Sequence, residues 1–561
     1  MLPWQRAAPE SEAAERPAMR IYLYDSTLRD GAQTQGVDFS AADKAAIAHA
    51  LDRFGIDYIE GGWPGANPTD DAFFANPPEL AHARLTAFGM TRRAGRSAAN
   101  DPGLAALCGS SVPTLCLVGK SWDFHVATAL GVDLDENLRM IAESIEHARA
   151  KAGEAIFDAE HFFDGFKANP AYALECLEAA YQAGASWIVL CDTNGGSLPH
   201  EVERIVAAAA ERIPGERLGI HCHNDTDNAV ANSLAAVRAG ARQIQGTING
   251  LGERCGNANL VSLIPTLMLK MGCETGIAMS RLAELNHISR LVDERLNQAP
   301  RRNAPYVGEG AFAHKAGLHV SAVEKNPACY EHIRPELVGN ARHIVVSDQA
   351  GRSNILARFR EIGLAVDASD AKLARLVEKV KEREFQGYAY DGAEASFELL
   401  ARRELDGLPR YFQTPSLRVE TERRFSAAGE LVTVSQAVIK VLVGEEPHME
   451  VAEGNGPVDA LDTALRKALA PHYPQLADMR LVDYKVRILT PSEGTKAVTR
   501  VMIESADGHG ERWATVGISA NIIEASYEAL RDGIVYKLFR DGAVAPHSEQ
   551  WPAPTGRSAP S

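Results

Sequence analysis

The sequence predicts an α/β fold: a parallel (β/α)8 barrel of the TIM type, then helical segments, then a separate α+β domain. Three observations predict it. Eight short apolar runs alternate with Ala-rich amphipathic stretches between residues 21 and 247. Polar and ionisable residues follow nearly all of these runs, and beyond residue 415 the pattern changes to repeated strand-like segments. A chain of 561 residues is also too long for one core.

The eight candidate barrel strands are each followed by a helix-like stretch, such as residues 41–54 or 170–183. They cover residues 21–24, 58–61, 85–88, 114–118, 155–158, 187–191, 218–222 and 243–247. Strands that alternate with helices indicate parallel β-α-β units, and eight of them favour a closed barrel over an open doubly wound sheet. No G-x-G-x-x-G follows the first run, which argues further against a dinucleotide-binding fold.

Beyond residue 260 the pattern indicates helices, with a polar, glycine-containing insert over 308–323. A helix is expected over 371–385, and a linker around 388–394. The C-terminal part predicts strands over 432–443, 484–489, 497–504 and 512–518, with helices over 457–469 and 520–539. This pattern indicates a strand-rich unit that is closed by a helix and then repeated, which suits a regulatory or dimerising α+β domain.

These changes of pattern predict five segments along the chain. We expect a disordered tail over 1–18, the catalytic barrel over 19–290 and helical linker subdomains over 291–410. A regulatory domain over 411–542 and a second disordered tail over 543–561 complete the chain.

Composition narrows the class of protein. The formal charge of −16 argues against a nucleic-acid partner or an anionic membrane surface. The eight cysteines form no C-x-x-C motif and accompany no secretory signal, which is typical of reduced thiols in a cytoplasmic protein. No apolar run reaches the roughly 18 residues that a membrane helix needs.

In a (β/α)8 barrel the catalytic groups lie at the carboxyl ends of the strands. Polar residues gather there: 25–30 follow the first strand, Glu60 ends the second, 158–161 end the fifth and 192–194 end the sixth. The pair His221 and His223 ends the seventh strand, and residues 249–257 follow the eighth. Random surface charge would not choose one end so consistently.

His221 and His223 are two residues apart on a strand, so both imidazoles point to the same face. Alone, such a pair is more often an accident of sequence than a ligand pair. Asp30, just past the first strand, completes a set of one carboxylate and two imidazoles, which suits Mg²⁺, Mn²⁺, Co²⁺ or Zn²⁺ and does not choose among them. Asn257 is either a further amide ligand or the cap of the following helix.

Three other polar residues are expected at the same end of the barrel, where the carboxyl ends of the strands meet. Arg29 is either a surface ion-pair partner or a clamp for a substrate carboxylate or a developing oxyanion. Glu160 is favoured as a functional carboxylate over an ordinary strand-end residue, and Thr193 is either a hydroxyl donor or a turn residue.

Several motifs together resemble the 2-isopropylmalate, homocitrate and citramalate synthase family, within the wider superfamily of barrel metallolyases. Residues 25–31 read DSTLRDG, 221–225 read HCHND, and 250–257 read GLGERCGN. Residues 454–460, GNGPVDA, and 522–526, IIEAS, are similar to the amino-acid-sensing domain of that family. The resemblance covers about residues 20–540 and implies that the C-terminal domain senses an amino acid and dimerises.

The resemblance implies a Claisen-type condensation of acetyl-CoA with a 2-oxo acid, followed by thioester hydrolysis, carried out by a homodimer. It implies that four residues bind a divalent metal, with Mg²⁺ or Mn²⁺ favoured and Zn²⁺ or Co²⁺ admitted: Asp30, His221, His223 and Asn257. Arg29 would stabilise charge on the keto oxygen, Thr193 would hold the substrate carboxylate, and Glu160 would move a proton or place the acetyl group. His319 and Tyr330 match the pair that family members offer across a dimer interface.

The departures from the family pattern bear on the substrate. Ala32 stands where 2-isopropylmalate synthases usually carry Glu, so that 29–33 read RDGAQ. The sequences of residues 61–64, GGWP, and 225–228, DTDN, resemble those of the long citramalate synthases more closely than those of 2-isopropylmalate synthases. The resemblance therefore favours pyruvate as acceptor, (R)-citramalate as product and isoleucine as effector, in a route to isoleucine. The alternatives are a 2-isopropylmalate synthase that uses 2-oxoisovalerate and a non-catalytic amino-acid sensor.

Overall fold

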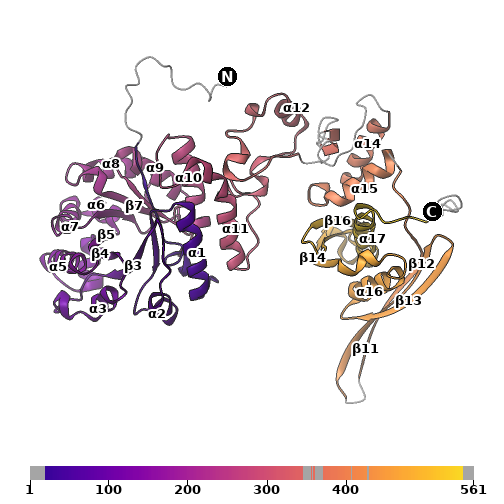
Figure 1. Cartoon of the computed structure of the whole chain (residues 1–561), viewed down its shortest axis with the longest axis horizontal. Helices are drawn as coiled ribbons and strands as arrows, with labels where there is room; N and C mark the ends of the chain where they lie inside the picture. Colours follow the sequence, from indigo (N-terminus) through magenta and orange to yellow (C-terminus); the bar gives the residue numbers. More distant parts are fainter. Residues whose placement is uncertain are drawn as a thin grey trace. The chain divides into compact units, whose positions relative to one another are not determined.

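Eight parallel strands close into a barrel, as the sequence predicts, in a computed structural model of the chain (Figure 1). They are β1 (Tyr22–Asp25), β2 (Tyr58–Gly62), β3 (Arg84–Met90), β4 (Thr114–Lys120), β5 (Glu154–Glu160), β6 (Trp187–Asp192), β7 (Leu218–Cys222) and β8 (Gln243–Gly246). β8 pairs with β1 in parallel, with Tyr22 opposite Gln243, which closes the ring.

The structure describes residues 19–344, 355–356, 358–359, 371–405, 407–425 and 429–546. The tails predicted over 1–18 and 543–561 lie outside these residues, except for 543–546. The chain forms two compact units. The first runs to Phe312 and includes His332–Arg342, and the second contains Ala313–Glu331 and the chain from His343 onward.

Helices surround the barrel and cover its outer face. They are α1 (Ala41–Phe54), α2 (Pro68–Ala75), α3 (Pro102–Gly109), α4 (Asp123–His125), α5 (Leu134–Ala152), α6 (Phe162–Ala168), α7 (Pro170–Gln182), α8 (Pro199–Ala210), α9 (Ala229–Ala239), α10 (Leu260–Leu269) and α11 (Leu285–Arg295). Local sequence sets their ends. Ser40 and Asp43 form a capping box at the start of α1, and Gly55, at φ 111°, ends that helix in a left-handed conformation that favours glycine.

The barrel unit has an apolar layer on each side of its strands. The layer between strands and helices contains Leu23, Ile59, Leu117, Ile188 and Ile220, all buried. A smaller cluster inside the ring includes Tyr24, Tyr58, Phe88, Ile156 and Trp187. Toward the carboxyl ends of the strands this interior becomes polar. The densely packed apolar cluster inside the ring supports the polar side chains at that end and limits their movement.

The second unit contains β9 (Ala313–His314), α12 (Gly317–Lys325), β10 (His343–Ile344), α14 (Ala371–Phe385) and α15 (Glu394–Leu405). Two antiparallel sheets follow: β11 (Gln413–Phe425), β12 (Leu431–Val443) and β13 (Glu446–Gly454), then β14 (Arg480–Ile488), β15 (Thr499–Ala506) and β16 (Arg512–Ser519). Helix α16 (Pro457–Leu469) packs on the first sheet, and α17 (Ile522–Arg540) packs on the second. This is the internal repeat that the sequence predicts.

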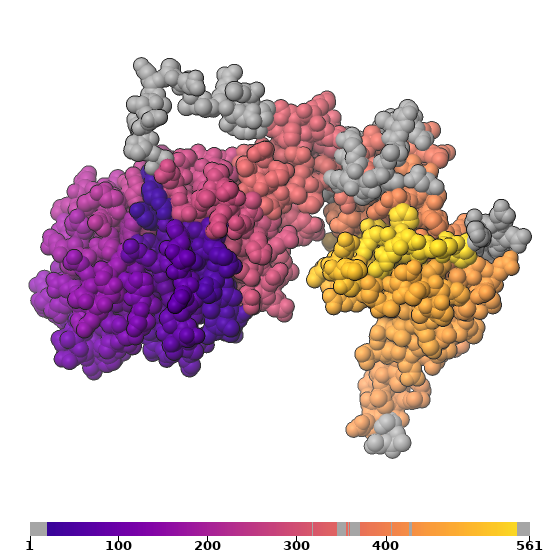
Figure 2. Space-filling model, viewed as in Figure 1, coloured from indigo at the N-terminus to yellow at the C-terminus, as the bar shows by residue number. Residues whose placement is uncertain are grey.

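The sequence did not predict β11 and β13. β11 is rich in Arg and Glu and largely exposed, so it carries little apolar alternation. β13 contains Pro447, which is tolerated because β13 is an edge strand of its sheet. β11 and β12 continue as a two-stranded arm that stands out from the rest of the second unit (Figure 2). Among the described residues, no helix is both long and apolar enough to cross a membrane.

Candidate active site

Asp30, His221 and His223 come together at the carboxyl end of the barrel strands. The Nε2 atom of His221 lies 3.3 Å from Oδ2 of Asp30, and Nε2 of His223 lies 3.9 Å from the same oxygen. One ligand atom from each residue lies within 4.8 Å of the other two, and all three side chains are buried. The N₂O set and its spacing match what a divalent cation requires of a protein.

The orientation of His221 is set by a chain of hydrogen bonds in the barrel interior. Nε2 of Gln245 donates to Oδ1 of Asp158 (3.1 Å), so Oε1 of Gln245 must accept from Nδ1 of His221 (2.8 Å). The Nδ1 atom therefore carries a proton, and Nε2 faces Asp30, where a bound cation would take the place of an Nε2 proton.

The electrostatics of the cluster favour an ionised Asp30. Burial alone would raise the pKa of Asp30, but the positive charge of Arg29 and the hydrogen bond to His221 hold it well below its usual range. Burial and the neighbouring His221 lower the pKa of His223 to about 3, which keeps that imidazole neutral. A charged carboxylate beside a neutral imidazole is the protonation state in which both can ligate a cation.

Asn257 contacts the cluster through a strained loop. Gly256 has φ +88°, and a Cβ there would lie 2.0 Å from the carbonyl oxygen of Gly250, so the turn requires glycine. Asn257 then pairs with His223 as an isolated β-bridge, and its Nδ2 donates to Oδ2 of Asp30 at 2.7 Å. Its Oδ1 is buried and has no hydrogen-bond partner among the described residues. The oxygen would face the cluster if the amide turned through about 180°.

Arg29 is held in place by three groups from β1, β2 and β3. Its Nε donates to Oε2 of Glu60 at 2.7 Å, and the phenol of Tyr24 donates to Oε1 of the same carboxylate at 2.7 Å. The guanidinium carbon lies 3.9 Å from the centre of the Phe88 ring. Both Glu60 and Tyr24 are fully buried, so the guanidinium of Arg29 is anchored to the rigid interior of the barrel.

Glu160 and Thr193 lie at the ends of β5 and β6. Glu160 forms an ion pair with Lys120 at the end of β4. The hydroxyl oxygen of Thr193 accepts from the backbone N–H of His161 at 2.9 Å, which leaves its own hydrogen able to donate toward the mouth. Both residues line the same cavity as Asp30.

His319 and Tyr330 belong to the second unit, not to the barrel unit. His319 lies on α12, and Tyr330 follows a short 3₁₀ turn over Pro327–Cys329. Their rings stack with centroids 4.0 Å apart, so the two candidates are neighbours of each other. The side chains of His319 and Tyr330 are both exposed to solvent.

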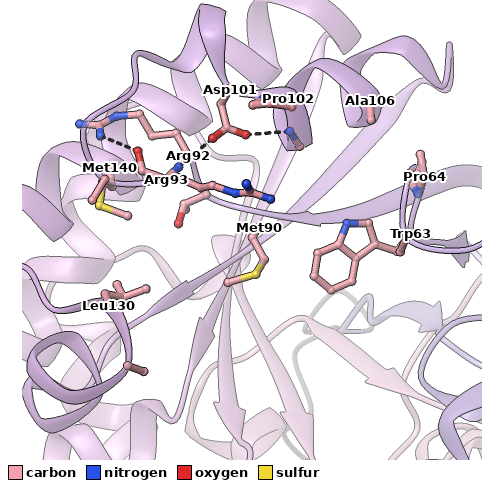
Figure 3. Close-up of a pocket in the computed structure, with 16 residues that line it drawn as sticks. Trp63, Pro64, Met90, Arg92, Arg93, Asp101, Pro102, Ala106, Leu130 and Met140 are labelled. Carbon is pink, nitrogen blue, oxygen red and sulfur yellow. Dashed lines mark hydrogen bonds between the residues drawn. The ribbon is translucent and has the colours of Figure 1, made fainter.

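Three cavities meet at the mouth, and Trp63, just after β2, lines all of them. The one that contains the cluster has a volume of about 300 Å³. A second, of about 500 Å³, is separated from it by Trp63 and Met90 and is lined also by Ala106, Leu130 and Met140 (Figure 3). The third, of about 390 Å³, lies beside Lys44 and Asp70.

The 500 Å³ cavity contains two arginines of different kinds. Arg92 is buried and paired with Glu136 and Glu143. Arg93 is exposed, and its positive charge contributes to the lowered pKa of Asp101, which burial alone would raise. Figure 3 shows Arg93 extending between Asp101 and Met90 toward Trp63. The cavity thus combines apolar lining residues with one exposed guanidinium, that of Arg93.

Sequence reasoning did not assign roles to Glu60, Gln245, Asp158 and Lys120. A signal for Gln245 was present, because Gln243 and Gln245 are polar residues two apart in a strand and so face the barrel interior together. Asp158 and Glu160 have the same spacing. The partners that these residues find across the barrel depend on the closed ring and not on local sequence.

Comparison with known proteins agrees with this architecture. The HMGL-like family matches residues 20–289, a homocitrate synthase post-HMGL domain-like family matches 306–387, and the LeuA allosteric (dimerisation) domain matches 391–538. The chain is 52% identical to an (R)-citramalate synthase of Aquifex aeolicus over 93% of this chain and 99% of that protein. It is 50% identical to that of Geobacter sulfurreducens (93% and 98% covered) and 49% to that of Synechocystis sp. (92% and 96%).

These alignments extend over nearly the whole of both chains, so they cover the barrel as well as the C-terminal sheets. The three matched families also follow one another in the order of the structural elements. The chain therefore belongs to the family of the (R)-citramalate synthases, HMGL-like barrels that carry a LeuA allosteric (dimerisation) domain.

Proposed function

We propose that this protein is an acyltransferase that condenses acetyl-CoA with pyruvate and hydrolyses the thioester, releasing (R)-citramalate and CoA. The observation that carries the proposal is the full-length similarity to proteins named (R)-citramalate synthase, at 49–52% identity. The carboxylate and imidazole cluster at the barrel mouth supplies a site suited to the acceptor. We further propose that the product feeds a route to isoleucine.

Asp30, His221 and His223 would hold a divalent metal, with Mg²⁺ or Mn²⁺ favoured over Zn²⁺ or Co²⁺, and Asn257 would provide a fourth ligand. The fit rests on the clustered ligand atoms and on the buried Oδ1 of Asn257, which has no partner among the described residues. A bound cation would supply Lewis-acid polarisation of the keto group, the electrophile of the condensation.

Arg29 would stabilise the negative charge that develops on the keto oxygen. Its guanidinium is fixed by Glu60 and Phe88, so it needs little reorganisation when that charge appears. The hydroxyl of Thr193 would donate to the carboxylate of pyruvate. Its oxygen already accepts from His161, which directs the free O–H.

Glu160 would take part in proton transfer or place the acetyl group, since it ends β5 in the cavity of the cluster. Condensation removes one proton from the acetyl methyl, forms a carbon–carbon bond to the keto carbon and leaves a thioester that water then cleaves. His319 and Tyr330 would assist enolisation or activate that water. Support for the pair is their mutual stacking and their resemblance to residues that family members offer across a dimer.

The cavity beyond Met90 would take the long arm of acetyl-CoA. Its volume of about 500 Å³ and its apolar floor suit an extended pantetheine chain, and it shares Trp63 and Met90 with the cavity of the cluster. Arg93, which is exposed and lines this cavity, would attract the anionic phosphates.

The remaining proposals concern the C-terminal half. We divide the chain into a catalytic barrel over 19–290, linker subdomains over 291–410 and a regulatory, isoleucine-sensing domain over 411–542. Support comes from the matched families and from exposed apolar side chains on two edge strands, among them Met449 and Val451 on β13 and Val486 and Ile488 on β14. A second copy of the chain would cover these residues in a homodimer.

CoA release tests the proposal, measured with pyruvate, 2-oxoisovalerate and 2-oxoglutarate in turn. We expect a much higher kcat/KM with pyruvate. Preference for 2-oxoisovalerate would instead make the chain a 2-isopropylmalate synthase. Activity with none of the three acids would favour the alternative of a non-catalytic amino-acid sensor. Calorimetric titration with isoleucine and with leucine tests the effector, and sedimentation equilibrium tests the dimer.

A further inference from the structure

A second group of metal-ligand side chains lies in the C-terminal domain, far along the sequence from the barrel residues. It consists of Glu446, His448 and His472, whose ligand atoms lie within 4.8 Å of one another. All three belong to the second unit. Nothing in the proposed condensation uses them.

His448 points toward the helix that covers its sheet. In β13 the exposed side chains of Met449 and Val451 alternate with the buried Ala452 and the half-buried His448. α16 packs against β12 and β13. Because successive side chains of a strand face opposite sides, the imidazole of His448 lies on the helix-covered side of the sheet.

His472 is positioned by the turn that follows α16. The backbone N–H groups of His472 and of Tyr473 both donate to the carbonyl of Leu469 at 3.0 Å. The buried Tyr473 anchors the turn further, since its hydroxyl donates to the carbonyl of Tyr411 at 2.7 Å. His472 therefore approaches β13 from a fixed segment and not from a free loop.

The two imidazoles meet at their Nε2 atoms, which are 2.7 Å apart, with ring planes inclined by 67°. Oε2 of Glu446 lies 3.9 Å from Nε2 of His448. Two neutral imidazoles can share only one hydrogen bond here, and they must adopt opposite tautomers to do so. Metal–nitrogen bonds of about 2.0–2.1 Å would place the two Nε2 atoms about 3 Å apart, so a small separation of the rings admits a cation.

We propose that Glu446, His448 and His472 form a second divalent metal site, selective for Zn²⁺ and similar transition metals. Two imidazole nitrogens and one carboxylate oxygen suit Zn²⁺, Co²⁺ or Ni²⁺ and disfavour Mg²⁺ and Ca²⁺, which prefer oxygen ligands. The partial exposure of the group leaves room for water as a fourth ligand. A cation here joins the start of β13 to the segment after α16, so it stabilises the sheet–helix pair by mass action.

Zinc binding to the full-length chain tests this site in a His221→Ala background, which weakens the barrel cluster. We expect calorimetry with Zn²⁺ to detect about one equivalent per chain, and His448→Ala or His472→Ala to weaken binding by more than about tenfold. His509→Ala, at an exposed histidine in the same unit, is the control and should bind as the parent does. The more conservative His448→Gln and His472→Gln, checked by circular dichroism, guard against loss of fold.

Absence of Zn²⁺ binding in the His221→Ala background would overturn the proposal and leave the pair as a simple hydrogen bond. Binding of equal strength in all the variants would also overturn it. The assay needs no turnover, so its result is independent of whether the chain makes citramalate.

Discussion

Nε of Arg29 donates to Oε2 of the fully buried Glu60 at 2.7 Å, and this ion pair fixes the guanidinium beside the cluster of Asp30, His221 and His223. The phenol of Tyr24 occupies the other oxygen of Glu60, so the carboxylate has little freedom to move. With the role proposed above for Arg29, Glu60 would be a positioning residue that acts on the substrate through Arg29.

Glu60→Gln should disturb catalysis without removing Arg29. The amide would present a donor where Arg29 or Tyr24 now donates, so the guanidinium would lose its fixed position. We expect kcat/KM for pyruvate to fall by roughly 10–100-fold, the cost of a misplaced charge at a reacting centre. Steady-state kinetics with Glu79→Gln, an exposed residue, as control would measure this. Unchanged kinetics would show that Arg29 needs no such support.

Gln245 and Gln243 offer a matched pair of substitutions in the barrel interior. Gln245 orients His221, whereas the buried amide of Gln243 has no hydrogen-bond partner among the described residues. Gln245→Met should therefore lower metal affinity by about 10–100-fold, while Gln243→Met should leave it unchanged. Competition with a chromophoric chelator would report both affinities. Equal effects of the two changes would contradict the assigned role of Gln245.

Removal of the metal should abolish activity reversibly. After dialysis against a chelator we expect no CoA release, and restoration by Mg²⁺ or Mn²⁺ more than by Zn²⁺ or Co²⁺ would identify the preferred ion. Asp30→Asn should not be restored by any of the four, because an amide replaces the charged ligand. Full activity of the chelated enzyme would exclude the assigned role of the cluster.

The 500 Å³ cavity predicts a selective effect on one substrate. Ala106→Trp should fill it and Arg93→Ala should remove its exposed guanidinium, so each should raise the KM for acetyl-CoA by about tenfold while the KM for pyruvate stays the same. Arg96→Ala, at an exposed arginine outside the cavity lining, serves as control. An increase confined to the pyruvate KM would place the acetyl-CoA arm elsewhere.

Asp25 should make stability depend on pH. Burial raises the pKa of this carboxyl from 3.8 to about 7, against hydrogen bonds from Thr27 that lower it. The folded chain therefore binds more protons than the unfolded chain between about pH 4 and 7, so the free energy of unfolding falls as the pH rises through that window. Asp25→Asn should remove about 2–4 kcal/mol of this fall.

Urea unfolding of the parent and of Asp25→Asn at pH 5, 6, 7 and 8 would measure the difference in slope. The exposed Asp38 provides the control substitution Asp38→Asn, which should follow the parent. Parallel curves for the parent and Asp25→Asn would show that Asp25 does not titrate in this range.

Patterns in the amino-acid sequence were enough to predict the barrel, the repeated C-terminal unit and the strand ends at which polar residues gather. They were enough because a strand period of two, a helical apolar face and turn residues are local properties of the chain. His221 and His223 share a face for the same local reason. β11 and β13 were not predicted because exposed, charged edge strands do not alternate apolar and polar residues with a period of two.

The pairing of side chains across the barrel depends on how the strands are arranged in the folded domain. Asp30 meets His221, His223 and Asn257 because β8 pairs with β1 and closes the ring, bringing together strands that are distant along the chain. Glu60 meets Tyr24 and Arg29 because β2 pairs with β1. Gln245 can orient His221 only because β7 and β8 are neighbours with His221 opposite that residue. Contacts between distant segments depend on packing of the whole domain, so no window of sequence contains them. Asp30 and His221 were candidates from sequence, and closure of the barrel places them 3.3 Å apart.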